Sequence, residues 1–176
     1  MTTGGSSKTW WERFWPERIR TEGQSKGAVP GGLWQKCDNC SVILYRDDLE
    51  KNLGVCPKCA HHHRIGARQR LDWLLDAEPR QELAPTLQAL DPLGFKDSKA
   101  YPDRLAQARQ ATGEQDALVV VQGQILQLPI IAAAFELEFI GGSMGSVVGE
   151  KFTQAAEIAR QERIPLVCFA ASGGAR

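Results

Sequence analysis

Two groups of residues in this chain of 176 amino acids have types and spacings that could do chemistry: four paired cysteines and two glycine-rich turns. Cys37 and Cys40 form one C-x2-C pair, Cys56 and Cys59 form a second, and fifteen residues separate the pairs. Each pair turns tightly and points both sulfurs inward, so two pairs supply four thiolates at the corners of a tetrahedron, the geometry that zinc prefers. We therefore predict one structural Zn²⁺ per chain, with no open position for catalysis.

Two disulfides, or a redox pair, are the alternatives to zinc for these cysteines. A redox site does not need two C-x2-C turns, and a chain without a secretion signal favours a metal over disulfides. His61, His62 and His63 follow shortly after Cys59. Because four thiolates already satisfy the metal, we expect these histidines to hydrogen-bond locally or to begin the next helix.

The first glycine turn matches the Gly-x-Ser-x-Gly nucleophile elbow letter for letter, and it lies between a predicted strand and a predicted helix. Its residues are Gly141, Gly142, Ser143, Met144 and Gly145. A nucleophilic serine also needs a histidine later in the chain, and none follows Ser143. The turn lacks the Gly-Lys-Ser/Thr ending of a phosphate-binding P-loop as well. We therefore expect its backbone, rather than its serine, to bind substrate.

The second glycine turn contains Gly173 and Gly174, directly after a short apolar run at 165–170. Without side chains, their N–H groups could approach a substrate carbonyl and stabilise an enolate or a tetrahedral oxyanion. An ordinary strand-ending glycine turn accounts for the same residues. The residues alone leave both interpretations open.

Hydrophobic periodicity predicts the elements that position these groups. Apolar residues at helical spacing predict helices over 10–19, 64–76 and 102–111, and a further helix from Val148 to Ala159. Alternating or continuous apolar runs predict strands over 117–125 and 130–139, a buried parallel strand over 165–170, a short strand near 81–84, and a hairpin over 41–55. Composition divides the chain into an N-terminal segment and linker at 1–32, a zinc ribbon at 33–62, a helix and connection at 63–97, and a main domain at 98–176.

Composition excludes some classes of protein. A hydrophobic content of 43% is enough for a packed core, and a net charge of zero gives no field that draws the whole chain to nucleic acid or membrane. No apolar run approaches the ~20 residues of a membrane helix. We therefore expect a soluble cytoplasmic protein with no membrane partner.

Together, these motifs resemble the N-terminal part of the carboxyltransferase β subunit of bacterial and plastid acetyl-CoA carboxylase. The resemblance rests on the segments 33–37, 52–59, 61–64, 141–152 and 171–176. It implies an α/β, crotonase-like core of repeated ββα units, incomplete here, preceded by a four-cysteine zinc ribbon. It also implies a cytoplasmic location, or the plastid stroma if the chain is plastid-encoded.

The resemblance implies a transferase that moves a carboxyl group from carboxybiotin to acetyl-CoA and yields malonyl-CoA for fatty-acid synthesis. The implied partners are a carboxyltransferase α subunit in an α2β2 assembly, the biotin carboxyl carrier protein, and biotin carboxylase, which consumes the ATP. Gly173 and Gly174 would then be the backbone donors that hold the thioester oxygen as it gains charge. The biotin ureido nitrogen would take the proton, so no catalytic dyad is needed.

Full-length members of this family continue beyond the equivalent of Arg176 and carry a further glycine pair there. We therefore expect a fragment that, on its own, forms no complete site and yields no malonyl-CoA. Arg176 is a candidate contact for a CoA phosphate or the α subunit, and Cys168 is expected to be a small buried hydrophobe.

Two other functions compete with this one. Residues 36–70 carry seven Lys or Arg against four acids, so the zinc ribbon could bind nucleic acid weakly and in a salt-dependent way. A solvated surface or a subunit contact explains the same charges. A different crotonase-type acyl-CoA enzyme, such as a decarboxylase or a propionyl-CoA carboxyltransferase, is the other alternative.

Overall fold

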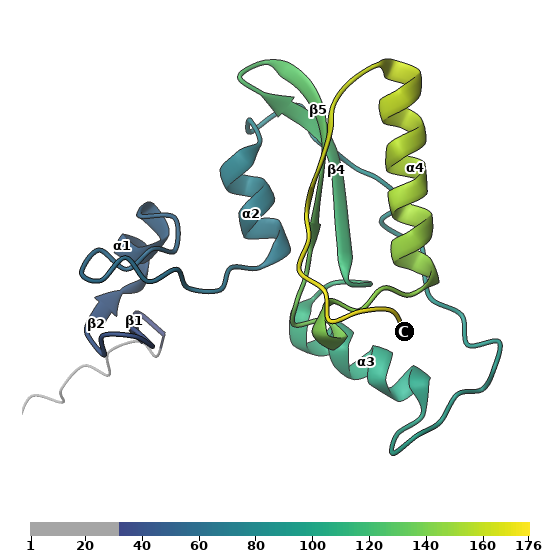
Figure 1. The fold of residues 1–176 in the computed structure, drawn as a ribbon, viewed down its shortest axis with the longest axis horizontal. Helices are drawn as coiled ribbons and strands as arrows, with labels where there is room; N and C mark the ends of the chain where they lie inside the picture. The colour runs from purple at the N-terminus through teal and green to yellow at the C-terminus, as the bar shows by residue number, and fades with distance from the viewer. Residues whose placement is uncertain (1–31) are drawn as a thin grey trace, which may run out of the picture.

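A computed structural model describes residues 32–176 (Figure 1). The predicted helix over 10–19, and all of the predicted segment 1–32 except Gly32, lie outside the described residues. The elements run in the order β1 (Trp34–Lys36), β2 (Ile43–Tyr45), α1 (Arg46–Lys51), α2 (Ala67–Leu74), β3 (Gln81–Glu82), α3 (Tyr101–Thr112), β4 (Leu118–Ile125), β5 (Leu128–Phe135), the 3₁₀ turn η2 (Ile140–Gly142), α4 (Ser146–Glu162) and β6 (Leu166–Phe169).

The main sheet has the strand order β3-β4-β5-β6. β4 and β5 form a long antiparallel hairpin that pairs Leu118 with Phe135 and Ile125 with Leu128. Leu126 and Gln127 make its two-residue turn, both with positive φ, as a turn that matches the twist of a hairpin requires. β6 returns from α4 and pairs with β5 in parallel. One ββα unit followed by a parallel strand is therefore present.

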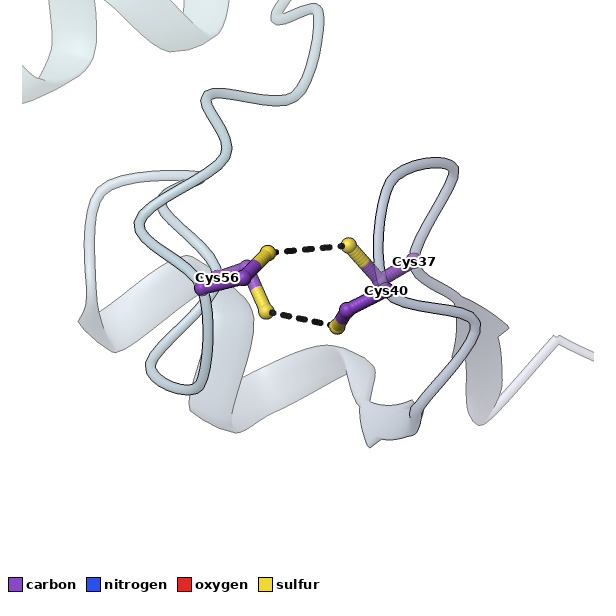
Figure 2. A group of neighbouring side chains, drawn as sticks. Cys37, Cys40 and Cys56 are labelled. Carbon is purple, nitrogen blue, oxygen red and sulfur yellow. Dashed lines mark hydrogen bonds between the residues drawn. The ribbon is translucent and has the colours of Figure 1, made fainter.

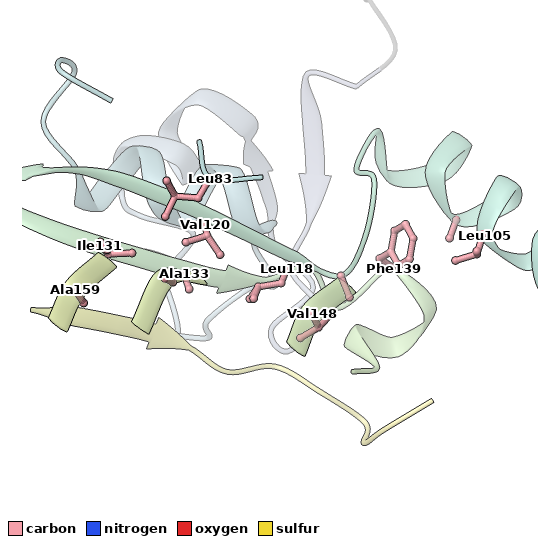
Figure 3. Close-up of a cluster of buried hydrophobic side chains, with 12 residues drawn as sticks. Leu83, Leu105, Leu118, Val120, Ile131, Ala133, Phe139, Val148 and Ala159 are labelled. Carbon is pink, nitrogen blue, oxygen red and sulfur yellow. The ribbon is translucent and has the colours of Figure 1, made fainter. Parts of the chain in front are cut away.

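Both faces of the β4–β5 hairpin are covered, which explains why these strands are almost continuously apolar. Leu118, Val120, Ile131 and Ala133 face α4 and cluster with its Val148, Ala155 and Ala159. Leu105 of α3 joins the same cluster beside Phe139 (Figure 3). The alternate residues Val119, Val121, Ile130, Ala132 and Ala134 face α2, where they meet Ala67, Leu71 and Leu75. The alanines of β5 leave room for both helices to approach closely.

Helix α2 is fixed to the sheet by charge as well as by packing. Arg68 donates to Glu114 at 2.6 and 2.8 Å and to Glu82 at 2.9 Å, and both hydrogen-bonded carboxylates raise the pKa of the guanidinium. At the start of the helix, Glu136 Oε2 accepts from the Ala67 amide at 2.9 Å. Glu136 follows β5 directly, so the end of that strand caps a helix 69 residues earlier in the chain.

Several predicted elements are confirmed and others need correction. The helix predicted over 102–111 is α3, and it ends at Gly113 with a left-handed φ of 75°. The helix predicted over 64–76 begins only at Ala67 and ends at Leu74. Residues 41–55 are no hairpin: they contain β2 and then α1, and β2 instead pairs backward with β1.

The strand predicted to run through Phe139 ends at Phe135. Residues 136–139 turn instead, and this turn carries Phe139 into the core, where it is fully buried. β6 is parallel, as predicted, but it is not fully buried, because it lies at the edge of the described sheet with Val167 39% exposed. Among residues 32–176, no helix is both long and apolar enough to cross a membrane.

Candidate metal centre and glycine-turn site

The four predicted cysteines come together as one cluster, with all four sulfurs within 4.8 Å of one another. Cys37 Sγ lies 3.7 Å from Cys59 Sγ, and Cys40 Sγ lies 3.8 Å from Cys56 Sγ, so the sulfurs of the two turns face one another (Figure 2). A regular tetrahedron with bonds of ~2.3 Å to Zn²⁺ places its sulfurs about 3.8 Å apart. The cysteines are free thiols, and the arrangement fits a structural zinc ion.

The surroundings of the cluster favour the thiolate form at Cys59 and the thiol form at Cys40. A hydrogen bond from the Asn39 side chain and one from the His61 backbone lower the pKa of Cys59 to about 6. At Cys40 the hydrogen bond from the Val42 backbone lowers the pKa, but burial and the neighbouring thiols outweigh it and raise the pKa to about 11. Four thiols this close cannot all ionise without a cation, so a metal must replace their protons as it binds.

The histidines lie beside the cluster, as local hydrogen-bonding groups. His63 is buried, and its Nδ1 lies 3.3 Å from the Gln35 side-chain nitrogen. Backbone bonds from Cys56 N to His61 O and from His63 N to Gly54 O tie this segment to the second cysteine pair. The next helix begins at Ala67, so the alternative that the histidines start it is wrong.

The two predicted glycine turns lie against each other through their backbones. Met144 N donates to Gly174 O at 2.8 Å, and Arg176 N donates back to Met144 O at 2.9 Å. Gly173 N donates to Gly141 O at 2.9 Å. Segments far apart in the sequence, one before α4 and one after β6, therefore form a single site.

Gly142 is required by this contact between the turns. Its φ is +64°, and a Cβ at this position would collide with the carbonyl oxygen of Ala171 and lie 3.1 Å from its carbonyl carbon. Only a residue without a side chain allows the second turn to approach this closely. Gly142 therefore serves the packing of the two turns, whereas a Cβ on Gly141 would meet nothing within 4 Å.

The predicted oxyanion donors are already hydrogen-bonded in this conformation. Gly173 N donates to Gly141 O at 2.9 Å, and Gly174 N donates to Ser172 Oγ at 3.1 Å. Gly173 is nevertheless exposed and Gly174 half-buried, so neither amide lies in the packed interior. Their role as oxyanion donors stays a prediction, and it requires the Gly173 amide to exchange the Gly141 carbonyl for a substrate oxygen.

Ser143 is held by Arg176 rather than by a general base. Arg176 Nη1 donates to Ser143 O and, at 3.0 Å, to Ser143 Oγ. Its Nη2 donates to both oxygens of Asp116 at 2.8 Å, and its Nε donates to Tyr101 Oη at 3.2 Å. Burial lowers the pKa of Arg176, but the hydrogen bond to Tyr101 and the charge of Asp116 outweigh it, so the pKa is raised.

Sequence reasoning found Arg176 but no partner for it, and it missed Asp116. Asp116 is only 1% exposed, two residues before β4, and it pairs with a residue 60 positions away. The available signal was one acidic residue directly before a long apolar strand. Lys151 was also missed: it is 2% exposed, and its Nζ donates to Leu118 O at 3.1 Å.

Two hollows flank the paired turns. One, of about 670 Å³, lies at the carboxyl ends of β5 and β6 and is lined in part by Arg64, Arg70 and Ala171. The other, of about 510 Å³ and mostly apolar, is lined in part by Leu93 and Arg176. Ligands of α/β sheets bind at the carboxyl ends of strands, so the first hollow lies where such a fold places a substrate.

Comparison with known proteins gives one match to a family and several to solved structures. Residues 34–59 match the acetyl-CoA carboxylase zinc finger domain. The fold is similar to that of transcarboxylase 12S with methylmalonyl-CoA and methylmalonic acid bound, at 27% identity and a TM-score of 0.51, over 64% of this chain and 20% of that one. This chain thus spans about a fifth of the length of that transcarboxylase subunit.

Two further structures are more distant. A single-chain, multi-domain long-chain acyl-CoA carboxylase is 20% identical with a TM-score of 0.50, over 62% of this chain and 11% of that one. The β subunit of geranyl-CoA carboxylase from P. aeruginosa is 22% identical with a TM-score of 0.46, over 74% of this chain and 20% of that one.

The family match covers the cysteine cluster, and the transcarboxylase likeness shows that the α/β region is crotonase-like. A zinc finger of the acetyl-CoA carboxylase type and a carboxyltransferase fold therefore occur in one chain. The chain therefore resembles the N-terminal portion of β-type carboxyltransferase subunits, and its residues 34–59 match a zinc finger of the acetyl-CoA carboxylase type.

Proposed function

We propose that this chain takes part in carboxyl transfer from carboxybiotin to acetyl-CoA, which yields malonyl-CoA. The observation that carries the proposal is the pairing of an acetyl-CoA carboxylase zinc finger at 34–59 with a transcarboxylase-like fold. The fold supports the reaction class, and the zinc finger favours acetyl-CoA over the branched substrate named in the transcarboxylase structure. Fatty-acid synthesis would consume the product.

Residues of this chain would contribute backbone groups rather than a titrating dyad. Loss of a proton from the acetyl methyl group places negative charge on the thioester oxygen, and fixed amides can hold that charge. Gly173 and Gly174 would supply such amides after exchanging their present acceptors, Gly141 O and Ser172 Oγ, for the substrate oxygen, and the hollow of about 670 Å³ beside Ala171 offers room for the acyl-CoA. Its Arg64 and Arg70 would meet phosphate groups. Carboxybiotin would supply the carboxyl group.

The proposed partners are a carboxyltransferase α subunit, the biotin carboxyl carrier protein and biotin carboxylase, in the cytoplasm or the plastid stroma. The multi-subunit character of the transcarboxylase named above supports a partnership of this kind. The zinc would hold the ribbon in shape and take no part in bond making.

The test is carboxyl transfer measured in the reverse direction, with the full-length gene product assembled with its partner subunits. Malonyl-CoA and biocytin are supplied, and formation of acetyl-CoA is followed; methylmalonyl-CoA is the competing substrate. We expect kcat/KM for malonyl-CoA to exceed that for methylmalonyl-CoA by about tenfold or more, as one excluded methyl group allows. Preference for methylmalonyl-CoA would refute the assigned substrate, and transfer from neither would refute the reaction.

A further inference from the structure

The Asp116–Arg176 ion pair is the most completely buried charged group beside the glycine turns. Asp116 is 1% exposed, and the Arg176 side chain is 12% exposed. Both carboxylate oxygens accept from a single guanidinium nitrogen at 2.8 Å. Burying two charges is costly unless each is fully hydrogen-bonded, so a pair retained here fixes a geometry rather than adding stability.

The remaining nitrogens of Arg176 reach two other segments. Nη1 donates to the carbonyl and the hydroxyl of Ser143, in the first turn, and Nε donates to Tyr101 Oη, at the start of α3. The guanidinium also lies 5.5 Å from the centre of the Phe139 ring. Arg176 itself belongs to the second turn, so one side chain joins both turns to α3 and to the start of β4.

The two turns pack closely around the guanidinium group of Arg176, which restricts their movement. A Cβ on Gly145 would lie 3.1 Å from Arg176 Nε and 3.2 Å from its Cζ. The backbone bonds of Met144 with Gly174 and Arg176 run beside this side chain. Movement of the first turn must therefore break bonds to Arg176, to the second turn, or to both.

We propose that Arg176, anchored by Asp116, is a positioning residue that sets the separation of the two glycine turns and thereby the direction of the Gly173 amide. This inference rests on the proposed function for its catalytic consequence, since the Gly173 amide acts only if an acyl oxygen can replace the Gly141 carbonyl. Arg176 acts through the turns and touches no reacting atom. Lysine cannot replace it fully, because one ammonium group cannot hold both Asp116 and Ser143 in the planar geometry of a guanidinium.

The structural half is tested in this 176-residue chain by amide hydrogen exchange followed by NMR. In Arg176→Gln, protection of the Gly173 and Met144 amides should fall at least about tenfold, because the bonds between the turns open more often. Amides of β4 and β5 should keep their protection. Asp97→Asn is the matched control. It removes the exposed ion-pair partner of Arg104 in α3, the helix whose Tyr101 contacts Arg176, and it should leave the protection of the Gly173 and Met144 amides unchanged.

Unchanged protection at Gly173 in Arg176→Gln would overturn the proposal. If that variant loses the protection of β4 and β5 as well, it has unfolded, and Arg176→Lys and Asp116→Asn decide the question instead. Each of these two variants keeps most of the side-chain volume. Each should lower the protection of the Gly173 amide, by less than the tenfold expected for Arg176→Gln, while the amides of β4 and β5 stay protected. Full protection at Gly173 in both would also overturn the proposal.

The catalytic half is tested in the full-length enzyme assembled with its partner subunits. Arg176→Gln should lower kcat about a hundredfold, the usual effect of losing one oxyanion donor, and change KM for the acyl-CoA less than about threefold. Arg176→Lys should recover part of kcat. A residue that only stabilises the fold would lower the amount of active enzyme without this pattern, and unchanged kcat would refute the positioning role. Absence of transfer in the unmodified enzyme refutes the proposed function instead, and leaves the exchange result standing.

Discussion

Gly142 shows most directly how a single residue determines the site. Its left-handed φ and its contact with the Ala171 carbonyl both exclude a side chain. The sequence suggested that the glycines of this turn bind substrate, which stays a prediction, and the structure adds that Gly142 is needed for packing between the turns. The requirement for glycine was predictable from the motif, but its cause was not, because the obstructing carbonyl lies 29 positions later in the chain.

We expect Gly142→Ala to lower the free energy of unfolding by about 3 kcal/mol or more, because the new methyl group forces the two turns apart and strains the backbone. Chemical denaturation monitored by circular dichroism measures the change. Gly149→Ala is the matched control: nothing lies within 4 Å of its Cβ, and it lies inside α4, so it should raise stability by roughly 0.5–1 kcal/mol. Equal effects of the two variants would contradict this account of Gly142.

The cysteine cluster and the Asp116–Arg176 pair differ in how much of each could be predicted. All four cysteines were identified from the sequence, because a C-x2-C turn is a local pattern. Two such turns at this spacing together predict one four-cysteine site. Asp116 has only the weak local signal of an acidic residue before an apolar strand. Its partner Arg176, and the Ser143 and Tyr101 hydroxyls that Arg176 also contacts, come from three other segments of the chain. Only the fold brings them together.

At the scale of elements, α4 carries a charge in an unusual place. Lys151 lies on the buried face of this helix, beside β4, and burial lowers its pKa even though Glu82, Asp116 and Glu114 raise it. A helix face that meets a sheet is ordinarily apolar. The neighbouring residues Val147, Val148, Ala155 and Ala159 follow that rule.

We expect Lys151→Met to raise the free energy of unfolding at neutral pH by about 1 kcal/mol, because a neutral side chain of similar length avoids burying a charge. The folded pKa of Lys151 lies below its ordinary 10.5, so the cost is fully present at neutral pH and is relieved as the pH rises towards 10.5. The increase in the free energy of unfolding caused by Lys151→Met should therefore become smaller as the pH rises. Denaturant titrations at pH 7 and at pH 10 measure both values, and a gain that grows with pH would contradict the prediction.

Elements with a strong local pattern were predicted well, and those that depend on distant contacts were not. α3 follows from its helical period and from Gly113 at its end, and β4 and β5 follow from their apolar runs, although β5 spans Leu128–Phe135 rather than the predicted 130–139. The alternation at 135–140 looked like a continued strand, but Glu136 leaves the sheet to cap α2 and Phe139 turns inward. Tertiary contacts therefore override the local period there.

At the scale of the whole molecule, the zinc ribbon and the sheet have separate cores. The ribbon cluster contains only Leu44, Leu49 and buried cysteines, whereas the sheet has an extensive cluster on each face. So small a core does not support folding without its metal. The buried clusters of the sheet contain none of the four paired cysteines.

We expect a chelator to abolish amide protection throughout the ribbon while the amides of β4 and β5 remain protected, as measured by hydrogen exchange. The matched variants are Cys56→Ser, which should lose the single bound zinc, and Cys168→Ser, which removes a cysteine of β6 outside the cluster and should retain it. Zinc content per chain is measured by elemental analysis. Loss of β4–β5 protection on chelation would show that the two cores are not independent.

The carboxylate of Glu136 gives these two regions a common anchor. Its Oε2 accepts from Ala67, where the chain arrives from the ribbon, and its Oε1 accepts from Glu138, three residues before the first glycine turn begins. A rotation of α2 away from the sheet would break the first bond and leave Oε2 without its backbone donor. One carboxylate thus connects the start of α2 to the segment that leads into the paired turns, through two hydrogen bonds.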